Sequence, residues 1–142
     1  MISETQLLNH IYQTAEMGVD GVQSVMKYAN EPKLRESLNA QMTEYRKLQD
    51  AAAEMLRKRS REPEGIGTMA KMGSEMMTAM KTMTDHSATK IAEMMIQGNT
   101  MGVTKSIRTI RDCEMKDERV RDLANKLLDT EQANIEEMKK YL

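Results

Sequence analysis

The residues best suited to chemistry are carboxylates and amides that recur at helical spacing. Glu131 and Asn134 lie three residues apart in one segment of the chain. Gln41 and Glu44 have the same spacing in another segment, and Glu16 lies on a third, partly apolar stripe. On a helix, a spacing of three puts both side chains on one face. These side chains therefore predict a polar centre between helices.

Such a centre could bind a cation or could be a hydrogen-bond network. Iron and zinc sites usually add imidazole or thiolate ligands to carboxylates. The sequence has two histidines, His10 near a predicted helix start and His86 at a predicted cap. Two interpretations follow. Either Glu16, Glu44 and Glu131 hold a metal ion, or the polar residues form a buried network that fixes how the helices align.

Apolar residues at intervals of three and four predict the long helices that position these side chains. Ser3 and Gln6 form a capping-box pattern, and Pro32 suits the first turn of a helix. The expected helices cover residues 3–28, 32–59, 88–111 and 117–142. The most regular seam, in the second helix, consists of Leu34, Leu38, Gln41, Tyr45, Leu48, Ala52 and Met55.

These elements predict an all-α protein, a four-helix bundle in a single domain over residues 1–142. Two arrangements fit: two tight hairpins joined by a long crossover, or an up-down-up-down bundle with an extra helix at one end. The second-to-third connection contains a predicted Met-rich helix over residues 68–83. Its Met stripe is interpreted as core packing. A partner-binding face, a membrane-surface helix and copper binding are the alternatives.

The amino-acid composition limits which kinds of partner and which cellular location we expect. Charged residues of both signs make up 30% of the chain, and the formal net charge is −1. This balance gives no electrostatic reason to expect nucleic acid as a partner. The basic run at residues 57–61 is interpreted as cations at a helix C-terminus, with a phosphate or RNA contact as the alternative. No stretch is apolar enough for a transmembrane segment. The lone Cys113 suits a reducing compartment, so we expect a cytoplasmic location.

Glycines interrupt two predicted helices, Gly18 and Gly21 in the first and Gly98 and Gly102 in the third. Each glycine costs up to about 1 kcal/mol in a helix interior. We expect close helix–helix approach to offset that cost.

The helix order and the stretch from His86 to Gly98 resemble the ferritin-like superfamily, particularly its small bacterial members. Metal-binding members place a Glu on the first and third long helices and a Glu-x-x-His on the second and fourth, which together hold two metal ions. Here Glu131 has Asn134 in place of the histidine, and the pair formed by Gln41 and Glu44 matches at neither position.

The resemblance therefore implies a binding or structural module without an intact two-metal site, not an enzyme, which associates as a homodimer or another homo-oligomer. The alternative is a metal-binding or redox protein that uses Glu16, Glu44 and Glu131, with iron or manganese as the cofactor.

Overall fold

The computed structural model describes residues 1–65 and 77–142 of the chain. The described residues contain helices and no strand, apart from an isolated bridge between Ile2 and Cys113. The long helices are α1 (Glu4–Met26), α2 (Pro32–Lys58), α4 (Ala88–Arg111) and α5 (Glu118–Lys139). Residues 77–82 form a short helical stretch. Most of the Met-rich helix predicted over residues 68–83 lies outside the described residues.

The predicted helix starts are confirmed: side chains cap α1, α4 and α5, while α2 begins at Pro32 and has no side-chain cap. At α1 the Ser3 hydroxyl accepts the Gln6 N–H at 3.1 Å, and the Gln6 side chain accepts the Ser3 N–H at 2.8 Å. The side chains of Ser87 and Asp117 cap α4 and α5 in a similar way. Each cap satisfies a backbone donor that a helix start leaves free, so local sequence specifies the start.

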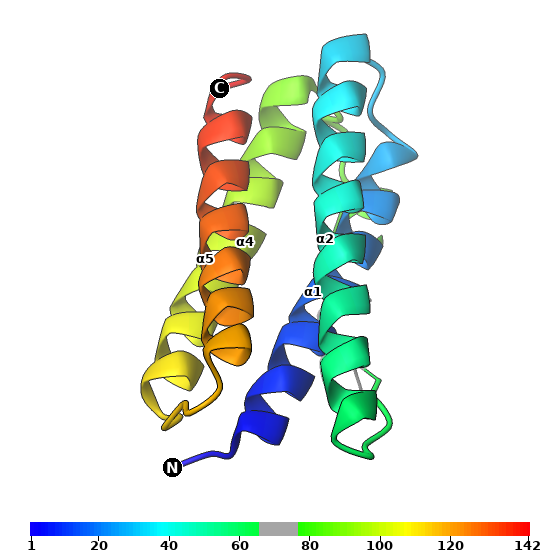
Figure 1. Ribbon diagram of the computed structural model, residues 1–142. Helices are drawn as coiled ribbons and strands as arrows, with labels where there is room; N and C mark the ends of the chain where they lie inside the picture. Colours follow the sequence, from blue (N-terminus) through cyan, green and yellow to red (C-terminus); the bar gives the residue numbers. More distant parts are fainter. Residues whose placement is uncertain (66–76) are drawn as a thin grey trace.

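The helices form two antiparallel hairpins that lie side by side, α1 with α2 and α4 with α5 (Figure 1). Helices α1 and α5 run in one direction, and α2 and α4 run in the other. Helix α2 ends at the end of the molecule opposite to the one where α4 begins. These directions agree with the long-crossover arrangement, one of the two that the sequence predicts.

Two apolar clusters fill the interior. One contains Leu7, Leu8, Ile11, Ala15, Val19, Tyr45, Leu48, Ala52, Leu56, Cys113, Val120, Leu123, Ala124 and Leu127. The other contains Val22, Val25, Ala29, Leu34, Leu38, Met80, Ile91, Ala92, Met95 and Met138. The helical spacing of the sequence also predicts inward positions for Met101 and Leu142, but these residues are 57% and 63% exposed. Met101 lies two residues beyond buried Asn99, on the opposite side of α4, and Leu142 lies beyond the end of α5.

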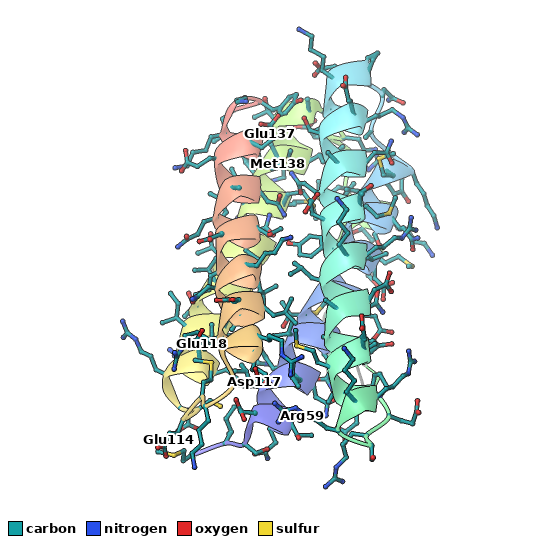
Figure 2. The ribbon with its side chains drawn as sticks, viewed as in Figure 1. Arg59, Glu114, Asp117, Glu118, Glu137 and Met138 are labelled. Atoms are coloured by element: carbon teal, nitrogen blue, oxygen red, sulfur yellow. The ribbon has the colours of Figure 1, made fainter. Side chains whose placement is uncertain are left out.

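A cluster of ion pairs lies at one end of the molecule. Arg59, just after α2, lies 3.2 Å from the Asp117 carboxylate and 3.5 Å from that of Glu4. Figure 2 shows Arg59 and Asp117 at this end. Glu4 Oε2 also accepts the backbone N–H groups of Lys116 at 3.1 Å and Asp117 at 2.8 Å. One arginine of the basic run therefore links the two hairpins, in addition to the helix-end role expected for the run.

Candidate binding site in the helix interior

A layer of buried polar side chains lies in the interior, and each long helix contributes two of them. The spacings within the pairs are four residues in α1 and α2, seven in α4 and three in α5, which keep each pair on one helix face. The layer consists of His10, Thr14, Gln41, Tyr45, Asn99, Ser106, Glu131 and Asn134. The prediction that Gln41, Glu131 and Asn134 make the centre polar is confirmed, and Asn99 is buried with them.

Hydrogen bonds connect the layer across three helices. The Ser106 hydroxyl, fully buried, donates to Glu131 Oε1 at 3.4 Å. His10 Nε2 lies 3.0 Å from that hydroxyl and 3.4 Å from the Thr14 hydroxyl. Since the Ser106 hydroxyl donates its hydrogen bond to Glu131, its oxygen is free to accept a hydrogen bond from His10 Nε2. The result is a chain from His10 in α1, through Ser106 in α4, to Glu131 in α5.

Burial disfavours the charged forms of the two groups at the ends of this hydrogen-bonded chain, His10 and Glu131. Desolvation raises the pKa of Glu131 to about 7, and the Ser106 hydrogen bond offsets only part of that effect. Desolvation lowers the pKa of His10 to about 4, and the nearby positive charge of Lys105 contributes in the same direction. His10 is therefore neutral near pH 7, and at that pH Glu131 is present both as the acid and as the carboxylate.

A cavity of about 100 Å³ adjoins Glu131 between α1 and α4. Its lining is mostly apolar and includes four glycines. The lining residues are Thr14, Met17, Gly18, Gly21, Tyr45, Met95, Gly98, Asn99, Gly102 and Glu131. A larger surface groove, which carries Lys105 and Arg108, shares Thr14, Met17, Gly98 and Gly102 with the cavity. The shared residues show that the cavity and the groove are neighbours.

Two of the glycines make room for polar side chains. A Cβ atom added at Gly18 would lie 2.7 Å from ring atoms of Tyr45, and one added at Gly102 would overlap the carboxylate of Glu131. Tyr45 and Glu131 belong to the hairpin partners of the glycine-bearing helices. Close helix–helix approach stays a prediction, and at these two positions the missing side chains leave space for a tyrosine ring and a carboxylate.

Several buried polar atoms of the interior have no hydrogen-bond partner among the described residues. They are the Asn99 and Asn134 amide nitrogens, both amide atoms of Gln41, and Oε2 of Glu16. The Tyr45 hydroxyl does have one, because it donates to Asn99 Oδ1 at 2.7 Å. Nearly all buried polar groups in proteins are paired, so unpaired ones mark places where water or a ligand belongs.

The structure separates the three glutamates predicted as metal ligands. Glu131 faces the interior, and Glu44 forms an exposed ion pair with Lys47 at 3.2 Å. Glu16 is half-buried, with a pKa raised by desolvation and by the charge of Asp20. Within residues 1–65 and 77–142, no three side chains of His, Cys, Asp or Glu are grouped so that they could hold a metal ion. Use of these glutamates as ligands stays a prediction.

The buried positions of His10, Thr14 and Ser106 were not predicted from the sequence. His10 and Thr14 are four residues apart, on the same side of α1 as the fully buried Ile11. That spacing was the signal available for α1. Ser106 lies seven residues after Asn99, which is two helical turns along the same face. The second histidine, His86, lies outside the layer, with its ring centroid 4.4 Å from that of Tyr28.

The fold and this site define a helical protein with a polar interior and an adjoining cavity. The sequence profile of DUF2383, described as a domain of unknown function, matches residues 3–112, and the chain belongs to this family. The match includes α1, α2 and α4, while Glu131 and Asn134 of α5 lie outside it. No curated protein matches the sequence.

Two solved structures share the fold. A DUF305 fragment from Deinococcus radiodurans is 17% identical, with a TM-score of 0.76 over 96% of this chain and 93% of that chain. YcfI from Rhodopseudomonas palustris, described as a proposed structural protein, is 14% identical, with a TM-score of 0.60 over 94% of this chain and 88% of that chain. None of the described helices is long and apolar enough to cross a membrane.

Proposed function

We propose that the chain is a ferritin-like four-helix bundle that acts as a small-molecule binding module and has no intact two-metal site. The observation that carries the proposal is Glu131, a 2% exposed carboxylate at the wall of a cavity, whose hydrogen bond comes from the single hydroxyl of Ser106. A purely structural interior would be expected to fill this space or to pair these atoms.

Similarity of fold supports the domain assignment. The DUF305 fragment aligns with 96% of this chain, which favours one domain over residues 1–142. Identities below 20% support the fold alone, so the binding role rests on the interior of this chain.

Occupancy of the cavity is testable by NMR. Uncharged molecules of four to six non-hydrogen atoms should shift the amide signals of Gly18 and Gly102 saturably. The variant Met95→Phe fills the cavity and should abolish the shifts, because Met95 is a lining residue. Met94→Phe, on the neighbouring half-buried position outside the lining, is the matched control and should still bind. Binding by neither the natural protein nor the control would refute the proposal.

The second candidate is the metal-binding or redox protein. Glu16 favours it, because one of its carboxylate oxygens is buried and unpaired among the described residues. It predicts stoichiometric iron or manganese in protein purified without chelator, and loss of that metal in Glu131→Gln. Metal content that is unchanged in Glu131→Gln, or absent from the natural protein, would refute this candidate.

Self-association remains part of the proposal. A homodimer or another homo-oligomer predicts a molar mass in light scattering that is a multiple of the 16.2 kDa chain. A mass equal to one chain at all concentrations would refute this part and would leave the binding role intact.

A further inference from the structure

We infer that the cavity between α1 and α4 binds a short uncharged alcohol, with the hydroxyl at Glu131 and the alkyl chain directed toward the surface groove. The inference rests on the proposed function and specifies its ligand. It is drawn from the polar atoms at the cavity wall, from the charges on either side of the cavity, and from its size.

Two polar groups at the wall are complementary to a hydroxyl. Glu131 Oε1 is engaged by Ser106, while Oε2 lies over Gly102, another lining residue, and no hydrogen bond joins it to a described residue. Asn99, 5% exposed, lines the same cavity, and its Nδ2 is a buried donor without a partner among the described residues. A hydroxyl can donate to Glu131 and accept from Asn99 at the same time.

The surrounding charges disfavour ions of either sign. An anion would meet the Glu131 carboxylate at the inner end of the cavity. A cation would pass Lys105 and Arg108, which line the adjoining groove. An anion would be buried without a partner, and the desolvation of a cation can exceed the Coulombic gain from its pairing with Glu131. A ligand whose polar group carries no charge is therefore compatible with the surroundings at both ends of the cavity.

Size and lining specify the rest of the molecule. A cavity of about 150 Å³ accommodates benzene, so 100 Å³ suits about four non-hydrogen atoms. Met17, Met95 and the Tyr45 ring provide an apolar wall for a short alkyl chain. A chain one or two carbons longer can extend along Met17 toward Met101 in the groove.

The test compares four probes of similar length on the natural protein: 1-butanol, 1-fluorobutane, butylammonium and butyrate. Amide shifts of Gly18, Gly98 and Gly102 report occupancy. We expect 1-butanol to bind saturably and about tenfold more tightly than 1-fluorobutane, the typical gain from one net hydrogen bond. Butylammonium and butyrate should cause no saturable shift. Met95→Phe should abolish 1-butanol binding, and Met94→Phe should preserve it.

The outcomes separate this inference from the proposed function. Equal binding of 1-butanol and 1-fluorobutane, or tighter binding of either ion, would overturn the alcohol while leaving the cavity as a binding site. Absence of binding by all four probes would overturn both and would mean that the cavity holds water only.

Discussion

Two carboxylates of this chain lie in opposite environments, Glu4 at one end of the molecule and Glu131 in the middle. Glu4 accepts two backbone N–H groups and lies 3.5 Å from Arg59, and these contacts lower its pKa below its ordinary value. Glu131 is bonded to one serine hydroxyl at 3.4 Å, and burial raises its pKa to about 7. The surroundings of Glu4 therefore stabilise its charged form, whereas the surroundings of Glu131 destabilise the charged form of that carboxyl group.

The difference distinguishes a stabilising contact from a candidate site. Carboxylates that serve stability are paired with donors or cations, as at Glu4. A buried carboxylate with an incomplete set of partners reduces stability, and such groups are concentrated where proteins bind or react. Glu131 fits the second description, because a cavity and the unpaired Asn99 amide adjoin it.

The largest expected effect comes from Glu131→Gln. The folded-state pKa is raised, so the natural protein loses stability as the pH rises from 4.5, the ordinary value, to about 7. The glutamine side chain of the variant does not ionise. At pH 8 the variant should therefore gain up to about 3 kcal/mol in free energy of unfolding, a difference that shrinks toward zero below pH 4.5. Urea unfolding at several pH values measures it.

His10→Gln is the matched variant for this pH profile. The folded pKa of His10 is lowered from 6.5 to about 4, so the natural protein loses stability as the pH falls through that interval. In the natural protein, Glu131 and His10 make the free energy of unfolding change with pH in opposite directions between about pH 4.5 and 6.5. The two contributions should nearly cancel in that interval. In each variant, the free energy of unfolding should therefore show the pH dependence that comes from the other residue alone. Parallel profiles for the natural protein and both variants would contradict the buried pair.

A smaller effect is expected from Gly102→Ala. The new Cβ would overlap the Glu131 carboxylate, and overpacking of this kind costs typically about 1–3 kcal/mol. The control is Gly98→Ala, at an exposed position one turn earlier in the same helix, where alanine should stabilise by about 0.5–1 kcal/mol. Thermal unfolding of both variants checks the contrast. Stabilisation by Gly102→Ala would mean that Glu131 does not lie over this glycine.

Arg59→Met should lower Tm by a few degrees, because it removes one cation shared by the half-buried Glu4 and Asp117. The folded pKa of Glu4 is lowered, so its contribution is present above its ordinary pKa and is lost as the pH falls. The difference from the natural protein should therefore shrink in acid. A difference that is constant with pH would assign the effect to packing of the arginine stem.

The smallest effect is expected at the surface pair of Lys139 and Glu136, which lie 2.7 Å apart with 53% and 70% of their side-chain surface exposed. Lys139→Ala should change stability by less than about 0.5 kcal/mol, because solvent screens such pairs. A loss as large as that of Arg59→Met would remove the distinction between the end cluster and ordinary surface charges.

Sequence predicts the helices of this protein well because their causes are local. Ser3, Pro32, Ser87 and Asp117 specify where helices begin, and intervals of three and four specify their buried faces. The crossover direction and the partners of Glu131 depend on contacts between distant segments. Glu44 shows the limit, since its spacing from Gln41 allowed an inward position, while the inward partner of Gln41 in the folded chain is Tyr45.

Titration of the Glu131 side chain, followed by carbon-13 NMR of its carboxyl carbon in metal-free protein, tests whether this carboxylate is buried beside the cavity. Burial at that position predicts a midpoint near pH 7. A midpoint near the ordinary value of 4.5 would contradict it. The carboxylate would then be solvated or paired, and the interior would have no site of the proposed kind.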